Sequence, residues 1–322
     1  MVPCLALLCV LFFFCLEVIR VFDAHYDLLT ILYCCYLRDD FSYVEKLQSD
    51  LSDVHSLIAN LYFMSRDEMK EELHIENINV VEMFRISTSL FKKYFGDKKV
   101  LFSIEGCDYI RDEVELEELY NLGLRNILLV WNNESKYGSG NRSDKGLSDL
   151  GKKIIKKAVN LGISIDLSHM NENTFWDSIK LLNNLKNDGY DVRVLASHSN
   201  SYSLCSNKRN LDDSQIEAIG ELSGKIGLVS YGPFINEKKI DLEENYLNHI
   251  KYIENIIGID NVMIATDNME FATDMFGVEE DISLLNHKNI IKSLTNILRN
   301  YYNSEEIDKI IKVNGERFIE ER

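Results

Sequence analysis

The sequence predicts an α/β protein whose fold is a closed (β/α)8 barrel, or TIM barrel, and three observations lead to this fold class. Eight short runs rich in apolar and β-branched residues recur along the chain, as buried parallel strands do. Amphipathic stretches with helical spacing separate these runs, and such alternation is typical of βαβ units. No Gly-x-Gly-x-x-Gly sequence follows the first run, so the main alternative, an open dinucleotide-binding sheet, loses support.

The predicted strands are continuous hydrophobic runs rather than alternations of apolar and polar residues. They cover residues 18–24, 78–84, 99–104, 126–130, 163–167, 192–196, 226–230 and 262–265. Among the segments between them, residues 150–161, 171–185, 212–222 and 243–257 carry apolar residues at helical spacing. Ser148 is a suitable N-cap for the first of these helices, and Gly162 follows its end. Eight strand–helix units are the number that closes a TIM barrel.

Charge and cysteine content limit the classes of partner and compartment. The 322 residues carry a net charge of −17, which would repel a polyanion, so nucleic acid is not an expected partner. The seven cysteines are odd in number and lack CxxC spacing, which favours reduced thiols over a disulfide framework or a zinc ribbon. Reduced thiols favour a cytoplasmic protein.

The N-terminus is unusual because residues 2–16 are almost wholly apolar. We therefore divide the chain into a segment of residues 1–19 and a single barrel domain of residues 20–322. No basic residue precedes the apolar run and no small-x-small cleavage site follows it, so we favour a non-native or mis-assigned start. The alternatives are a signal or membrane anchor, with export or membrane contact through residues 1–19, and a packed extension.

Polar residues with metal-binding groups follow the apolar runs, at the end of the barrel where the active sites of this fold form. They are His25 and Asp27 after the first run, Glu105 after the third, His169 after the fifth, His198 after the sixth and Asp267 after the eighth. Any one of them would be weak support for a site. Their joint placement predicts a metal-dependent hydrolytic centre at the barrel mouth.

The chemistry of these side chains indicates how they would share two ions. Zinc accepts imidazole nitrogen and carboxylate oxygen, and the i, i+2 spacing of His25 and Asp27 places both on one side of an extended chain. Glu105 has two oxygens and could bridge two ions, and His169 and His198 would complete the second. Two ions roughly 3.5–4 Å apart would hold a hydroxide between them and polarise a carbonyl group.

The other polar residues are not expected to bind metal directly. Asp23 and Asp166 lie beside the ligands, where hydrogen bonding to a ligating histidine and capping of a strand end are equally plausible roles. The remaining histidines are predicted to be structural or solvent-facing because they fall in helical or loop segments; they are His55, His74, His249 and His287.

Several motifs then resemble the membrane (renal) dipeptidase family of zinc peptidases, peptidase family M19, over residues 21–321. They are HYD at 25–27, IEG at 104–106, GLSDLG at 146–151, DLSH at 166–169, SHSN at 197–200 and RNLDD at 209–213. The resemblance implies a TIM barrel, two zinc ions per chain, and hydrolysis of dipeptides, often with tolerance for a D-residue at the C-terminal position. It also suggests a homodimer.

The same resemblance implies a role for each site residue. His25 and Asp27 would bind one zinc ion, and Glu105 would bridge to a second ion held by His169 and His198. Asp267 would be the general acid/base, Arg209 would hold the substrate's terminal carboxylate, and Tyr231 would line the pocket.

Two departures from the family pattern keep other functions open. Trp131 stands where many relatives carry a histidine that contacts substrate, and Asn268 follows Asp267 where relatives often have a second aspartate. A zinc dipeptidase is the favoured interpretation. A related metal-dependent amide or ester hydrolase acting on a modified peptide is the second. A barrel that has lost catalysis is the third, and retention of all five ligands and Asp267 argues against it.

Overall fold

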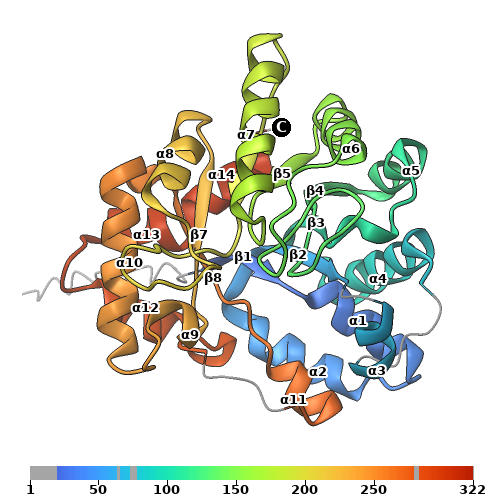
Figure 1. Ribbon diagram of the computed structural model, residues 1–322. Coiled ribbons are helices and arrows are strands. Elements are labelled where there is room, and N and C mark those ends of the chain that lie inside the picture. The colour runs from blue at the N-terminus through green and yellow to red at the C-terminus, as the bar shows by residue number, and fades with distance from the viewer. Residues whose placement is uncertain (1–19, 64–65, 73–77, 279–282, 322) are drawn as a thin grey trace, which may run out of the picture.

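A computed structural model of the protein describes residues 20–63, 66–72, 78–278 and 283–321, and the apolar segment 1–19 lies outside the described residues. Eight parallel strands pair in the order in which they occur in the chain, and helices surround them (Figure 1). The strands are β1 (Val21–Tyr26), β2 (Val54–Tyr62), β3 (Lys99–Glu105), β4 (Leu124–Leu128), β5 (Ser164–Asp166), β6 (Val194–Ala196), β7 (Lys225–Val229) and β8 (Val262–Ala265). The predicted TIM barrel is confirmed.

The second predicted strand is wrong, whereas the other seven overlap observed strands. Residues 78–84 lie at the start of helix α4 (Val80–Phe95), where the Asn79 side chain caps the helix by accepting from the Glu82 N–H. The buried residues of this helix recur at helical spacing, so its apolar start was mistaken for a strand. The actual β2 was missed because polar residues such as Asn60 interrupt its apolar run.

The predicted helices after β4, β5, β6 and β7 are all present. They are α6 (Asp149–Asn160), α7 (Glu172–Asn187), α8 (Asp213–Glu221) and α10 (Leu242–Ile257). Ser148 is the N-cap of α6, since its hydroxyl accepts from the Gly151 N–H. The other α-helices are α1 (Leu28–Leu37), α2 (Ser42–Asp50), α3 (Arg66–Glu72), α5 (Glu113–Leu122), α9 (Gly232–Ile235), α11 (Glu270–Phe276), α12 (Ile290–Leu298), α13 (Ser304–Asp308) and α14 (Asn314–Glu320). None of the helices in the described ranges has the length and apolar content needed to cross a membrane.

The carboxylate of Asp23 joins the first and last strands of the barrel. It accepts hydrogen bonds from the backbone N–H groups of His25 and Thr266 and from the Thr266 hydroxyl, and it lies 2.8 Å from Nε2 of His287. Asp166 has a comparable role between β5 and β6, because it accepts from the backbone N–H groups of Ser168 and Ser197. Capping of strand ends is therefore the observed role of both aspartates, and His287 is structural as predicted.

Helix α14 covers the barrel interior at the end opposite the predicted site. Phe318 packs with Phe22 and with barrel-lining residues such as Leu101 and Met263. Gly315 is needed at the contact, since a Cβ there would lie only 2.0 Å from the Phe22 ring. With this end filled, the open end of the barrel is the one formed by the carboxyl ends of the strands.

Candidate metal centre

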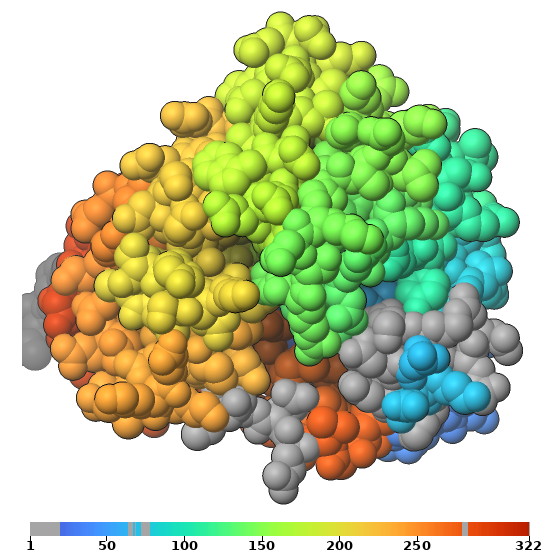
Figure 2. All heavy atoms as spheres, viewed as in Figure 1, coloured from blue at the N-terminus to red at the C-terminus, as the bar shows by residue number. Residues whose placement is uncertain are grey.

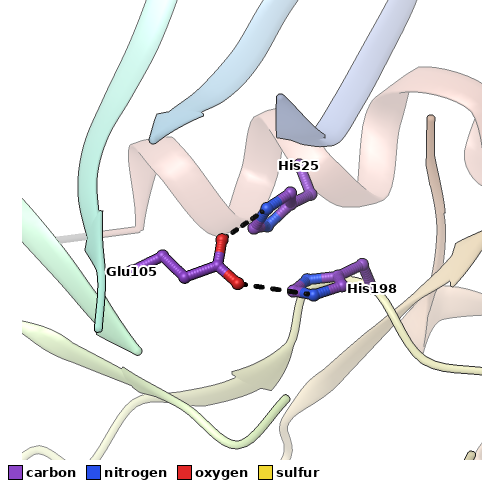
Figure 3. Close-up of side chains that lie close together, drawn as sticks. All are labelled: His25, Glu105 and His198. Carbon is purple, nitrogen blue, oxygen red and sulfur yellow. Dashed lines mark ion pairs between the residues drawn. The ribbon is translucent and has the colours of Figure 1, made fainter. Parts of the chain in front are cut away.

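Three imidazoles and one carboxylate converge at the floor of the barrel mouth. Nε2 of His25 lies 2.9 Å from Oε2 of Glu105, and Nε2 of His169 lies 2.9 Å from Oε1 of the same carboxylate. Nε2 of His198 lies 2.8 Å from that of His169 and 3.9 Å from Oε1 of Glu105. Figure 3 shows that the two oxygens of Glu105 face different histidines, His25 and His198. The Glu105 carboxylate thus lies between imidazoles that come from β1 and from the segment after β6.

Asp27 and Asp267 extend the cluster on the side of His25. Nε2 of His25 lies 3.8 Å from Oδ1 of Asp27 and 3.9 Å from Oδ1 of Asp267. Among the described residues, Oδ1 of Asp27 is buried without any hydrogen-bond partner. Because an unpaired buried carboxylate oxygen is costly, its position beside imidazole nitrogens fits a divalent cation. Two overlapping sets of ligand atoms, each within 4.8 Å, are present: His25, Glu105 and His198, and His25, Asp27 and Asp267.

Two of the predicted site residues have left-handed backbone conformations. His169 has a φ of 69° and Asp267 a φ of 46°, values that side-chain-bearing residues adopt at a cost. His169 is the third residue after the short strand β5, and Asp267 is the second residue after β8, where the chain leaves the barrel. This backbone conformation directs both side chains to the cluster at the barrel mouth.

A cavity of about 460 Å³ lies above the cluster and contains all three predicted substrate residues, Arg209, Trp131 and Tyr231. Figure 2 shows the surface hollowed there, between the green and the yellow segments. Nη2 of Arg209 is buried and has no hydrogen-bond partner among the described residues. The Trp131 ring packs edge-on against Tyr62, with the centroids 5.4 Å apart, and the Arg142 guanidinium lies 5.5 Å from the Trp131 ring centroid. The cavity thus combines the metal cluster with a cation able to bind a carboxylate.

Comparison with known proteins identifies the family. The sequence model for membrane dipeptidase (peptidase family M19) matches residues 81–322, which is most of the chain. The chain belongs to the membrane dipeptidase family. The ligand-type residues Glu105, His169 and His198 and also Asp267 fall within the matched range, while His25 and Asp27 precede it.

The chain has similar proteins in other organisms. An uncharacterised protein of Acinetobacter calcoaceticus is 32% identical over 170 residues, which are 48% of this chain and 50% of that protein. A dipeptidase of Claviceps purpurea is 24% identical over 291 residues, covering 87% of this chain and 64% of that protein. The chain thus spans half to two thirds of the length of these relatives.

A solved structure shares the fold along nearly the whole chain. It is a metallopeptidase from Rhodobacter sphaeroides crystallised with a phosphinate mimic of the dipeptide L-Ala-D-Ala. The TM-score is 0.72 at 19% identity, and the match covers 94% of this chain and 99% of that one. At this identity the likeness establishes the barrel fold.

Burial and the charges of neighbouring residues shift the pKa values of the clustered side chains. Burial alone would lower the pKa of His25, but Glu105, with Asp267 and Asp27, raises it to about 10. Burial raises the pKa of Asp27, and the charge of Glu105 adds to this. Burial also lowers the pKa of His169 to about 4. A protonated His25 therefore balances the carboxylates, and a metal ion would displace that proton because ligands bind in their deprotonated forms.

Residues that were not predicted from the sequence orient the imidazoles. Oδ1 of Asn132 lies 3.0 Å from Nδ1 of His169, and the Asn60 amide lies 3.1 Å from Nδ1 of His25. The Ser197 hydroxyl lies 3.0 Å from Nδ1 of His25 and 2.8 Å from Nδ1 of His198. Ser197 lies in the SHSN motif, so the sequence drew attention to its segment. Asn60 lies in β2, a strand that was not predicted.

Proposed function

We propose that this chain is a metal-dependent dipeptidase that binds two zinc ions per chain. The observation that carries the proposal is the convergence of three imidazole Nε2 atoms, Glu105 and the unpaired oxygen of Asp27 beneath a cavity that contains Arg209. Family membership supports it, as do the named dipeptidase among the sequence relatives and the structural relative solved with a dipeptide mimic.

The ligands divide into two sets that share one carboxylate. His25 and Asp27 would hold one ion, His169 and His198 would hold the other, and Glu105 would supply one oxygen to each. The facing of the two Glu105 oxygens toward His25 and His169 supports this division. When bound, the two ions would polarise the scissile carbonyl and make water a stronger nucleophile.

The remaining site residues bind substrate and transfer protons. Arg209 holds the terminal carboxylate through charge-assisted hydrogen bonds, for which its unpartnered Nη2 is available. Asp267 takes the proton of the attacking water and delivers it to the leaving amine. Its enclosed position raises the pKa of Asp267, which makes the carboxylate a better proton acceptor. Trp131 and Tyr231 form walls of the cavity.

A panel of L,L- and L,D-dipeptides tests this function. We expect cleavage that is lost after treatment with a chelator and restored by zinc, and metal analysis should give about two zinc ions per chain. A folded protein that neither binds zinc nor cleaves any dipeptide would contradict the proposal.

The aromatic wall supports a second candidate, hydrolysis of an amide bond in a modified peptide. Trp131 presents an aromatic surface against Tyr62, with Arg142 above it, rather than a small polar donor. Such a surface suits an acyl or cyclic group. Cleavage of N-acylated or cyclic substrates without cleavage of free dipeptides would favour this candidate.

A further inference from the structure

One buried hydroxyl lies between the two halves of the metal centre. The Ser197 side chain is fully buried, and its Oγ contacts Nδ1 of His25 at 3.0 Å and Nδ1 of His198 at 2.8 Å. For Nδ1 of His198, Ser197 is the sole hydrogen-bond partner within the described part of the chain. Nδ1 of His25 has a second neighbour, the Asn60 amide.

The lone pairs of this hydroxyl can serve both imidazoles at once. A serine hydroxyl has one hydrogen to donate and two lone pairs that accept. Its Oγ can therefore accept from Nδ1–H of His25 and from Nδ1–H of His198 together. The backbone N–H of Ser197 donates to the buried carboxylate of Asp166, which holds the residue in this position.

We propose that Ser197 is a positioning residue that sets the tautomer of His25 and of His198 together. An imidazole that carries its hydrogen on Nδ1 presents a bare lone pair on Nε2, the form that binds a metal ion. The Nε2 atoms of both histidines are the ones that face Glu105. Ser197, anchored to Asp166 through its backbone N–H, therefore prepares one ligand in each proposed ion site, and this inference rests on the proposed metal-binding function.

The two ion sites should differ in their dependence on Ser197. Without the hydroxyl, His198 loses its partner at Nδ1. His25 still has the Asn60 amide beside it, and because the Asn60 Oδ1 has no partner among the described residues, rotation of the amide can bring that acceptor to Nδ1–H. In Ser197→Ala we therefore expect zinc to be bound about ten- to a hundredfold more weakly at the site of His169 and His198, with a smaller change at the other site. Zinc affinity and stoichiometry are measured by competition with a chromophoric chelator.

Nitrogen-15 NMR of labelled histidines in the metal-free protein reads the tautomer directly. The wild type should show His198 with its hydrogen on Nδ1, Ser197→Ala should lose this preference, and Ser197→Thr should keep it because the hydroxyl remains. Ser164→Ala is the matched control, since Ser164 is also buried and hydrogen-bonded but contacts Arg125 and Asn126. An unchanged His198 tautomer in Ser197→Ala would overturn the inference. A wild type that binds no zinc would instead refute the proposed function, and the NMR result would still stand.

The charges that line the cavity indicate which substrates it prefers. The three carboxylates that line the cavity all belong to the metal cluster: Asp27, Glu105 and Asp267. The other charged residues lining it in the described ranges are cations, Arg142, Lys208 and Arg209, although the whole chain has a net charge of −17. One of these cations suffices for the terminal carboxylate that every dipeptide has.

We infer that the preferred dipeptides carry a second carboxylate, an aspartate or glutamate side chain, that Arg142 and Lys208 attract. Arg142 lies over the Trp131 ring, so its charge is presented at the cavity wall. Both cations are exposed at the rim, where water and salt screen their charges. The preference should therefore be several-fold, and should weaken as salt is raised. This inference also rests on the proposed function.

Pairs of dipeptides that have nearly the same shape but differ in charge test this preference. Glutamate and glutamine dipeptides, with the variable residue at either position, should differ by about three- to tenfold in kcat/KM at low salt. The ratio should approach one in the double variant Arg142→Met, Lys208→Met but not in Lys136→Met, an exposed cation outside the cavity. Equal kcat/KM values for the two dipeptides in the wild type would overturn the inference. If no dipeptide is cleaved, the proposed function fails, and the Kd values of the two dipeptides for Asp267→Asn still decide whether the cavity prefers the acid.

Discussion

Asp267 lies where either of two roles is geometrically open to it. Its Oδ1 is 3.9 Å from Nε2 of His25, and its ligand atom belongs to the same set as those of His25 and Asp27. Its side chain is also the most accessible of these, at 21% exposure, and it lines the cavity. Asp27 and Glu105 line the same cavity but are almost fully buried, so the greater exposure of Asp267 favours proton transfer over metal binding.

Replacement of Asp267 by asparagine distinguishes these roles. We expect kcat to fall by roughly a hundredfold or more, because an amide cannot accept the proton, while zinc content stays near two per chain. Kinetics and metal analysis on the same preparation provide the test, with Asp97→Asn, an exposed position, as the control. Loss of zinc from Asp267→Asn would make the residue a ligand and contradict its assignment as the acid/base.

The imidazoles also predict how the stability of the metal-free protein depends on pH. Between about pH 4 and 6.5 an unfolded His169 binds a proton that the folded one does not, so the free energy of unfolding rises with pH. His25 lowers the free energy of unfolding as pH rises. Its folded pKa of about 10 lies above the ordinary 6.5, so its contribution is complete below pH 6.5 and is lost as pH rises to about 10.

The stability of the chelator-treated protein should therefore be highest near pH 6.5. Each imidazole contributes a slope of at most about 1.4 kcal/mol per pH unit. Urea denaturation from pH 4.5 to 9.5 measures it, and His169→Gln should flatten the acid side. A profile that rises continuously toward pH 9.5 would contradict the role of His25.

At the scale of elements, α14 depends on close contact with the barrel. Asn314 donates hydrogen bonds to the carbonyl groups of Ile259 and Val262, and Gly315 lies against the Phe22 ring. The helix thereby joins the β8 region to the interior of β1. Its first turn leaves no space for an added methyl group.

Gly315→Ala should consequently lower the free energy of unfolding by about 1–3 kcal/mol, because the new Cβ would overlap the Phe22 ring. Urea midpoints measure the loss. Phe22→Leu makes room at the contact, so the double variant should lose less than the sum of the two single variants. Strict additivity would show that the two side chains do not compete for the same space.

At the scale of the whole molecule, closure of the barrel depends on Asp23. Its carboxylate accepts from two backbone N–H groups and from the Thr266 hydroxyl across the junction of β1 and β8, and it is fully buried. Removing it leaves several buried donors without partners. The backbone of Asp267, which donates to the carbonyl of His25, lies in the same junction.

Asp23→Ala should therefore destabilise the whole barrel by about 3 kcal/mol or more, since each unsatisfied buried donor costs about 1–3 kcal/mol. Denaturant unfolding followed by circular dichroism measures this, and Asp97→Ala, on the surface, should change the midpoint little. A loss below 1 kcal/mol would mean that other contacts close the barrel.

The pattern of apolar runs was enough to predict the fold class and to indicate which ligand-type residues lie together. Buried parallel strands must be continuously apolar, and residues that follow such strands meet at one end of a barrel, so His25, Glu105, His169 and His198 could be grouped without coordinates. The same reasoning failed for β2, because three-dimensional packing allows a polar residue such as Asn60 inside a buried strand when it contacts a site residue.

The contacts that hold the site in place could not be predicted without the folded structure. The unpaired oxygen of Asp27, the left-handed backbone of His169 and Asp267, and the Ser197 hydroxyl shared between two imidazoles all depend on segments far apart in the sequence. Hydrogen bonds act over about 3 Å and in defined directions, whereas sequence spacing constrains only neighbours along one strand or helix. The types of ligand residue could therefore be predicted from the sequence, whereas their orientation depends on contacts that form only in the closed barrel.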